Sequence, residues 1–408
     1  MASGRASSRR IAIIGAGIGG LTLAIALRRY GIDAHIYEQT NELREIGAAV
    51  ALSANGTRVL NQFGLTPQLA QHWFEVSALI FRDGRGGHVI GAHDVGAHYR
   101  QRFGAPYVGI HRADLQAILA SAAGLDRIYL RKHLVDIDDS GARAVLRFED
   151  GSTADADLVI GADGARSITR RWMLGYDDAL YSGCSGFRGV VPAGRMDLLP
   201  DPETIQFWVG PGGHLLHYPI GDQGDQNFLL VERYPSPWPS RDWVMPASEG
   251  EQLRLFKDWH PAVVQMITAV PISQRWGLFH RPPLGRWSKG RVTLIGDAAH
   301  ALVPHHGQGA NQSIEDAVVL AAQLGKAGPG NWREAQEAYE RLRRGRTRKV
   351  QYASITTADV LHLPDGPAAM ARNARLGARD SVTHHLDWIH DFDALTEVPD
   401  ERQGGTWL

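Results

Sequence analysis

Two short stretches carry side chains that could transfer a proton. His214 and Tyr218 lie four residues apart in a β-forming segment, so on a strand they would share one face while His217 points to the other. His305 follows Pro304 in a glycine-rich segment. A histidine titrates near neutral pH and can therefore act as a general base. A structural or surface role is the alternative for either histidine, and the sequence leaves both interpretations open.

The same residues do not predict a metal centre. His305 and His306 are adjacent, so they could not face one ion as two histidines four residues apart on a helix would. The chain has one cysteine, Cys184, which excludes an internal disulfide framework and a cysteine-rich metal site. Redox chemistry on this chain would therefore have to come from an organic cofactor.

The N-terminal segment has the spacing of a dinucleotide-binding turn. Residues 11–14 predict a buried strand, and Gly15-Ala16-Gly17 with Gly20 then supplies the G-x-G-x-x-G spacing at the start of a helix. Such glycines allow a tight turn, close approach of a pyrophosphate and close helix–strand packing. Glu38 ends the next predicted strand, about twenty residues further on, where it would accept hydrogen bonds from ribose hydroxyls. A glycine-rich turn without a ligand is the alternative.

Two further predicted strands end in Asp-Gly or Gly-Asp pairs. Residues 158–161 lead to Asp163-Gly164, and residues 292–295 lead to Gly296-Asp297. In open α/β sheets, ligands bind at the carboxyl ends of strands. A loop with Pro304, Gly307 and Gly309 follows, and a helix begins near Asn311. Small residues before a helix N-terminus let its N–H groups approach an anion. An ordinary turn is the alternative for Asp163-Gly164.

Taken in this order, the three motifs resemble those of the single-component FAD-dependent aromatic hydroxylases. The resemblance covers about residues 9–350 and is closest to the salicylate, 3-hydroxybenzoate and 6-hydroxynicotinate hydroxylases. It implies that the turn at residues 15–20 holds the adenosine diphosphate part of FAD. It also implies that Asp163-Gly164 contacts both FAD and the nicotinamide nucleotide, and that Gly296-Asp297 holds the ribityl chain.

The resemblance implies further cofactor contacts. Arg44 would lie near the FAD phosphates, Gly47 and Ala48 near the isoalloxazine ring, and Arg112 on FAD. A solvated surface position is the alternative for Arg44, and a salt bridge with Asp114 is the alternative for Arg112. Pro304 and Gly307 belong to the flavin loop, and backbone N–H groups around Gly309, Ala310 and Asn311 would face the flavin pyrimidine ring.

The reaction cycle that the resemblance implies needs a base. NADH or NADPH reduces the flavin, dioxygen adds to give a C4a-hydroperoxide, and the terminal oxygen attacks an electron-rich aromatic ring. His214, paired with Tyr218, is the first candidate to take the phenol proton, and His305 is the second. Phe187, Trp208 and Gln308 are the predicted substrate contacts, although core packing explains the two aromatic residues equally well. Only one dinucleotide fingerprint is present, so the nicotinamide donor would visit a shared cleft.

These elements predict an α/β fold with two interleaved parts. A Rossmann-like FAD-binding domain would comprise residues 10–74, 106–179 and 278–330, and a mostly antiparallel substrate domain residues 75–105 and 180–277. Residues 1–9 are predicted to form a mobile tail. Residues 331–408 are predicted to form a C-terminal helical segment whose role the sequence leaves open. Glutamates alternate with arginines in residues 331–351, which favours a solvated helix.

Composition narrows the partners. The formal net charge of -1 argues against a nucleic-acid or membrane-surface partner, and no apolar run approaches the length of a membrane span. The expected partners are a small aromatic substrate and dioxygen, for a cytoplasmic monomer or homodimer. Two alternative functions stay open at this point. One is an FAD dehydrogenase or halogenase-like enzyme without oxygenase activity, and the other is a flavin-based redox regulator.

Overall fold

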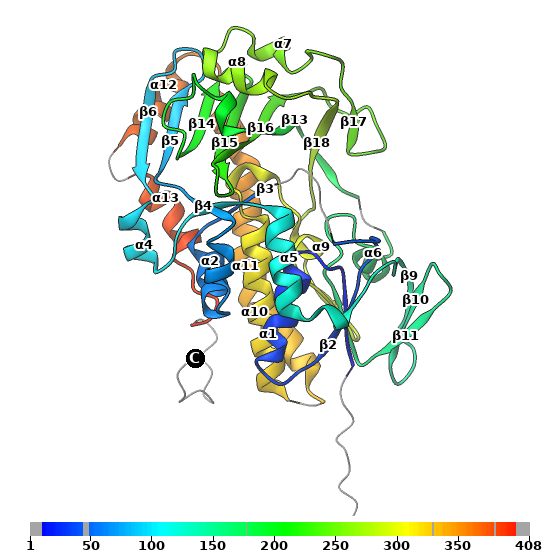
Figure 1. Ribbon diagram of the computed structural model, residues 1–408. Helices are drawn as coiled ribbons and strands as arrows, with labels where there is room; N and C mark the ends of the chain where they lie inside the picture. The colour runs from blue at the N-terminus through cyan, green and yellow to red at the C-terminus, as the bar shows by residue number, and fades with distance from the viewer. Residues whose placement is uncertain (1–9, 44–48, 177, 329, 379–380, 397–408) are drawn as a thin grey trace, which may run out of the picture.

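The computed structural model describes residues 10–43, 49–176, 178–328, 330–378 and 381–396, with residues 381–385 described by their backbone alone. The predicted tail at residues 1–9 lies outside the described residues, as do Arg44, Gly47 and Ala48. Three sheets and the long helices between them position the candidate site (Figure 1).

The first sheet has six strands in the order β19-β20-β12-β1-β2-β8. Its five parallel strands are β20 (Val292–Leu294), β12 (Leu158–Gly161), β1 (Ile11–Ile14), β2 (Ala34–Tyr37) and β8 (Ile128–Tyr129), and the antiparallel edge strand is β19 (Ser288–Lys289). All residues of β1, β12 and β20 are buried, as expected for parallel strands covered on both faces. This burial on both faces explains why the sequences of β1 and β12 are continuously apolar.

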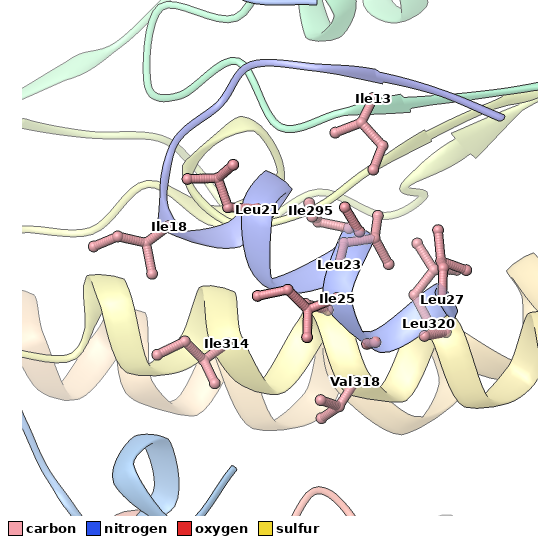
Figure 2. Packing of buried hydrophobic residues seen from close by; sticks show 14 of the residues in the cluster. Ile13, Ile18, Leu21, Leu23, Ile25, Leu27, Ile295, Ile314, Val318 and Leu320 are labelled. Atoms are coloured by element: carbon pink, nitrogen blue, oxygen red, sulfur yellow. The ribbon is translucent and has the colours of Figure 1, made fainter. Parts of the chain in front are cut away.

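One face of this sheet is covered by helices and the other by a small antiparallel sheet. Helix α1 (Ile18–Arg28) packs against α10 (Gly309–Ala327), and Figure 2 shows Ile25 of α1 pointing toward α10. The opposite face packs against β9 (Leu134–Asp138), β10 (Ala144–Phe148) and β11 (Thr153–Ala156). This packing fixes the start of α1 directly beyond the end of β1.

The second large sheet lies above α10 and forms the other wall of the site (Figure 1). Its order is β17-β18-β13-β16-β15-β14-β5-β6, and every neighbouring pair is antiparallel except β14 with β5. The strands are β5 (Ala78–Asp83), β6 (Val89–Asp94), β13 (Leu180–Val191), β14 (Ile205–Gly210), β15 (Gly213–Ile220), β16 (Asp225–Arg233), β17 (Val244–Pro246) and β18 (Gln274–His280). Strand β18 crosses the predicted domain boundary at residue 277, and the predicted boundaries otherwise stay a prediction.

A three-stranded sheet joins the two large parts. It consists of β3 (Ala49–Leu52), β7 (Val108–His111) and β4 (Trp73–Glu75). Strand β7 lies against β15 so closely that a Cβ atom on Gly109 would come within 2.1 Å of the Pro219 carbonyl oxygen. Only glycine fits at this crossing, so the close contact between β7 and β15 depends on Gly109.

The C-terminal helices differ in one respect from the sequence-based expectation. Helix α11 (Trp332–Leu361) packs along α10, followed by α12 (Pro367–Gly377) and α13 (Ser381–His390). The charged part of α11 is not solvated throughout, because Arg343 is fully buried against Glu315 and Asp316 of α10. Charge alternation alone could not reveal which arginine meets buried carboxylates on a neighbouring helix.

Candidate active site

The three predicted motifs converge at one edge of the first sheet. Strands β1, β12 and β20 are parallel neighbours, so the turns after them lie side by side. These turns border a cavity of about 770 Å³, whose other wall is the inner face of the second sheet. The lining residues on the motif side include Gly17, Ile18, Gly19, Gly164, Gly296 and Asp297.

The glycines of the first turn have distinct structural roles. Gly15 has a φ of +105°, and a Cβ atom there would lie 2.5 Å from the Ala162 carbonyl oxygen. A Cβ atom on Gly20 would lie 2.1 Å from the Gly15 carbonyl oxygen, whereas one on Gly17 would meet nothing within 4 Å. Gly15 and Gly20 therefore permit close packing, and Gly17 leaves open space toward the cavity.

Glu38 lies beside this turn, as the spacing predicts. Its carboxylate accepts hydrogen bonds from the backbone N–H groups of Ala16 at 2.7 Å and Thr40 at 2.9 Å. Each carboxylate oxygen can accept more than one hydrogen bond, so both remain able to bind a hydroxyl group. Gln116 fixes the same turn from α5 (Arg112–Ala123) by donating to the Ala16 carbonyl at 2.8 Å.

The Asp163 side chain is engaged within its own turn. It accepts hydrogen bonds from the Ser167 hydroxyl at 2.5 Å and from the Thr169 N–H at 2.9 Å, at the start of α6 (Ile168–Leu174). Burial raises the pKa of Asp163, and these hydrogen bonds offset only part of that effect. Gly164 lines the cavity with a φ of +75°. The geometry thus assigns Asp163 to shaping the turn and Gly164 to the cavity surface.

The loop after β20 is braced from α10 beneath it. Gly296 has a φ of +59° and donates its N–H to Asp316 at 2.8 Å, and Asp297 begins α9 (Asp297–His300) at the cavity. Pro304 begins the one-turn helix η3 (Pro304–His306), and Gly307 ends it at a φ of +61°. Gly309 and Ala310 line the cavity at the N-terminus of α10, where helix N–H groups have no helical partner.

Two polar residues predicted to contact ligands are engaged within the protein. The Gln308 side chain donates to the Ser53 hydroxyl at 2.9 Å and accepts from Asn55 at 3.1 Å. Asn311 accepts from the Ser53 N–H and donates to the Ala51 and Gly307 carbonyls. Both side chains hold the loop of residues 304–309, called the flavin loop, against β3. The predicted substrate contact of Gln308 would require its amide to leave this network.

Side chains along the strands of the second sheet alternate between the face that lines the cavity and the face that packs into the core. Phe207, Leu216 and Tyr218 line the cavity, whereas Phe187 and Trp208 lie in the cluster on the opposite face with Phe256 and Trp259. The structure therefore replaces Trp208 with Phe207 as the cavity-facing aromatic residue of β14. Adjacent residues on a strand point to opposite faces, so a shift of one residue in the predicted strand exchanges the cavity-facing and core-facing residues.

Three buried histidines meet at the cavity wall. His305 lines the cavity, and neither of its ring nitrogens has a partner among the described residues. The His214 ring lies 5.3 Å from it, behind the lining, and His214 Nδ1 lies 2.7 Å from Nε2 of His362 at the end of α11. Burial lowers the pKa of His305 and His362 to about 3 each and that of His214 well below its ordinary value. All three are therefore neutral at physiological pH.

Sequence reasoning found the first two histidines but not the third. His214 and Tyr218 share a face of β15, yet only Tyr218 reaches the cavity. His362 belongs to no motif and follows a charged helix, so no pattern in the sequence marks it. His390 and Tyr107 line the cavity, and no pattern in the sequence marks them either.

Comparison with known proteins identifies the family. Residues 9–354 match the family model described as an FAD binding domain. The chain is 38% identical to 3-amino-4-hydroxybenzoate 2-monooxygenase of Streptomyces cremeus, over 93% of this chain and 94% of that protein. It is 34% identical to 3-hydroxybenzoate 6-hydroxylase 1 of Aquipseudomonas alcaligenes, over 93% and 96% of the two chains. The chain belongs to the FAD-dependent aromatic hydroxylases.

A solved structure supports the same conclusion for the fold. Klebsiella pneumoniae HpxO, complexed with FAD and uric acid, superposes with a TM-score of 0.81 at 28% identity, covering 93% of this chain and 95% of that one. The predicted α/β architecture and the FAD cofactor are thus confirmed. Family membership also favours the hydroxylase interpretation over a dehydrogenase or a redox regulator.

The residues of this hydroxylase fit FAD. The open space at Gly17 lies at the N-terminus of α1, and the N-terminus of α10 lies at the same cavity. Helix N-termini attract anions and partial negative charge, which suits the pyrophosphate in the middle of FAD and the carbonyl oxygens of the flavin ring at one end. Within the described ranges, no helix has the length and apolar character needed to cross a membrane.

We expect Gly17→Ala and Gly20→Ala to affect the hydroxylase differently. Gly17→Ala should fold normally but retain at least about tenfold less FAD, because its Cβ enters only the open space beside the cavity. Gly20→Ala should lower the free energy of unfolding by about 1–3 kcal/mol as well, because its Cβ meets backbone. Gly194→Ala, at a position where a Cβ meets nothing within 4 Å and which is not among the lining residues of the cavity, serves as the control. Flavin content and thermal unfolding measure both effects, and equal flavin content in Gly17→Ala would contradict the assignment.

Proposed function

We propose that this hydroxylase acts on a single aromatic ring that carries a phenolic hydroxyl and a carboxylate. Both sequence relatives described above are named for hydroxybenzoates. The cavity suits such a ring, because Phe81, Phe207 and Leu216 offer flat apolar surface. Apart from Arg112, which we assign to FAD, the described lining residues include two arginines, Arg188 and Arg375, and one carboxylate, Asp297, which favours an anionic substrate.

The residue we propose as general base is His305. Bound FAD supplies the activated oxygen in this family, and the chain must take the phenol proton to make the ring carbon more nucleophilic. His305 is neutral and lines the cavity, and its two ring nitrogens are enclosed and without partners among the described residues, so a small turn of the ring would present one of them to a substrate. Leaving a buried polar atom unpaired costs about 1–3 kcal/mol, so a substrate hydroxyl bound there is favoured. This unpaired ring is the observation that carries the proposal.

Tyr218, His214 and His362 act beside this base or through it. Burial raises the pKa of Tyr218, so its hydroxyl remains protonated and can donate to a substrate oxygen. His214 contacts His305 on one side and His362 on the other. We propose that His214 and His362 position the His305 ring, which moves His214 from the predicted base role to a supporting one.

The residues that we propose to hold FAD are the predicted residues of the described motifs. They are Gly15, Ala16, Gly17, Gly20, Glu38, Arg112, Gly164, Gly296, Asp297, Pro304, Gly307, Gly309 and Ala310, with the backbone N–H of Asn311. Asp163 would contribute by shaping the turn that presents Gly164. We keep as further proposals the use of NADH or NADPH in a shared cleft, a cytoplasmic location and a monomeric or homodimeric state.

A substrate panel tests the proposed function. The FAD-loaded enzyme would be given salicylate, 3-hydroxybenzoate, 3-amino-4-hydroxybenzoate and 6-hydroxynicotinate, with phenol and benzoate as matched compounds that lack one group each. Consumption of NADH and of NADPH would be compared with hydroxylated product and hydrogen peroxide. We expect coupled product formation only with compounds that carry both groups. Preference for phenol over every acid, or no product from any acid, would contradict the proposal.

A further inference from the structure

The C-terminal helices, whose role the sequence leaves open, form part of the cavity wall. Leu376 of α12 and Leu386, Trp388 and His390 of α13 line it together with Leu361 at the end of α11. Helix α12 packs against β6, at the edge of the second sheet, and α13 lies beside it (Figure 1). This wall carries none of the FAD motifs, so its residues are available to a substrate.

Charged side chains fasten the end of α13 to three other helices. Arg346 of α11 donates to the Trp388 and Ile389 carbonyls at 2.8 and 2.7 Å. Asp387 forms an ion pair with Arg102 of α4 (Ala97–Phe103). Arg58 of α2 (Ala54–Gln62) donates to the Phe392 carbonyl at 3.0 Å. His390 therefore occupies a fixed position, and a fixed side chain can orient a ligand without losing conformational entropy.

The hydrogen bonds around His390 determine which ring nitrogen carries the proton. The Tyr99 hydroxyl oxygen accepts the Ala54 N–H at 3.0 Å and lies 3.0 Å from His390 Nδ1. Nδ1 is the acceptor within reach of the buried Tyr99 hydroxyl proton, so Nδ1 accepts. Burial lowers the pKa of His390 to about 3, so its ring is neutral and the single ring proton must be on Nε2.

We infer that the Nε2–H group faces the cavity. The other neighbours of the ring are the aromatic side chains of Phe103 and Tyr107, which surround it edge-on together with Tyr99. Among the described residues, Nε2 has no hydrogen-bond partner. Because His390 lines the cavity, this donor is open to a ligand there.

We propose that His390 is a substrate-contact residue whose Nε2–H binds the carboxylate of the aromatic substrate. The inference rests on the proposed function, which supplies the carboxylate. A neutral donor in a fixed tautomer favours an acceptor oxygen and rejects a donor group, so it would select the orientation of the ring. Arg375 of α12 lines the same cavity and adds the positive charge that a carboxylate requires. The C-terminal helices are thus the specificity wall of the site.

The test compares two amides at position 390. His390→Gln can place an amide N–H near the position of Nε2, whereas His390→Asn keeps a group near Nδ1 for Tyr99 but cannot reach the cavity. Each FAD-loaded variant would be titrated with 3-hydroxybenzoate, salicylate and phenol, and binding followed by the flavin absorbance spectrum. We expect His390→Asn to bind the two acids about 10–100-fold more weakly with phenol unchanged, and His390→Gln to retain most of the affinity.

Two further variants guard against a purely structural effect. His217→Gln changes a buried histidine on the opposite face of the sheet, bonded to Trp208 and Gln226, and should leave all affinities unchanged. Tyr99→Phe frees Nδ1 to take the proton, so acid binding should weaken even if His390→Asn does not fold. If the parent binds the acids and both His390→Asn and Tyr99→Phe match it, or lose acids and phenol alike, the inference fails while the proposed function stands. If the parent binds neither acid, both fail.

Discussion

His305→Ala should lower the rate of substrate hydroxylation by about 10²–10⁴-fold while the enzyme keeps its FAD. The motif residues that hold FAD are untouched by this change, and the ring removed is the one that meets the cavity. Without a base, the substrate stays a neutral phenol, and its ring reacts poorly with an electrophilic oxygen. NAD(P)H consumption should therefore continue but end increasingly in hydrogen peroxide rather than in product.

The pH dependence separates a base from a packing residue. Burial lowers the pKa of His305 to about 3, so its ring is unprotonated throughout the range from pH 6 to pH 9 and can accept a hydrogen bond from a phenol hydroxyl. A phenol ionises by itself near pH 10, so the deficit of His305→Ala should shrink as the pH rises. Rapid-reaction measurement of the hydroxylation step against pH tests this. A deficit that is constant with pH would contradict the base role.

The supporting histidines provide the matched comparison. His214→Ala and His362→Ala should each cause a smaller loss than His305→Ala, because they remove a neighbour of the base and leave the base itself in place. If His214→Ala instead shows the larger loss with the same pH dependence, the order predicted from the sequence, with His214 as the base, is the correct one. Coupling of NAD(P)H consumption to product would be measured for all three.

The sequence predicted the nucleotide motifs because each consists of a few consecutive residues at the end of a strand. Gly15 and Gly20 are required by backbone contacts within a few residues of a strand end, and the order of parallel strands then brings the three motifs together. The inner and outer faces of the second sheet were harder to assign. Trp208 and Phe207 are neighbours in sequence on opposite faces, and only the pairing of β14 with β15 decides between them.

Residues contributed by distant segments could not be predicted in the same way. His390 obtains its defined tautomer from Tyr99, 291 residues earlier in the chain, whose hydroxyl oxygen also accepts the Ala54 N–H. His362 gains its neighbour His214 from strand β15, 148 residues earlier in the chain. Neither residue has a spacing or a neighbour in sequence that distinguishes it from a surface histidine. Such sites depend on how α11 and α13 pack, which no local pattern determines.

The buried ion cluster of Arg343, Glu315 and Asp316, beneath the flavin loop, should contribute strongly to the free energy of unfolding. Arg343 bonds to Glu315, to Asp316 at 2.7 Å and to the Gln312 side chain at 2.8 Å, and all three charged side chains are fully buried. Arg343→Met keeps a long side chain in this position but removes the cation that pairs with the carboxylates of Glu315 and Asp316. Breaking a buried ion pair in this way costs about 3–5 kcal/mol, and we expect the free energy of unfolding to fall by that amount.

The same variant should also lose FAD, because the cluster supports a cofactor motif. Asp316 accepts the Gly296 N–H at 2.8 Å and bonds His300 at 2.5 Å. Burial alone would raise the pKa of Asp316, but His300 and Arg343 together hold it below the ordinary value. This lowered pKa adds stability above about pH 4 that disappears as the pH falls through the folded-state pKa. The difference between parent and Arg343→Met should therefore narrow in acid.

A matched arginine on the same helix tests whether burial is the cause. Arg333 pairs with Glu337 one turn away, and the Arg333 side chain is 91% exposed. Exposed pairs of this kind contribute about 0.3–0.5 kcal/mol, so Arg333→Met should leave unfolding and flavin content nearly unchanged. Chemical denaturation of both variants, at neutral pH and near pH 4, gives the comparison. Equal effects of the two substitutions would show that the Arg343 cluster does not support the flavin loop, and that Gly296-Asp297 keeps its geometry without it.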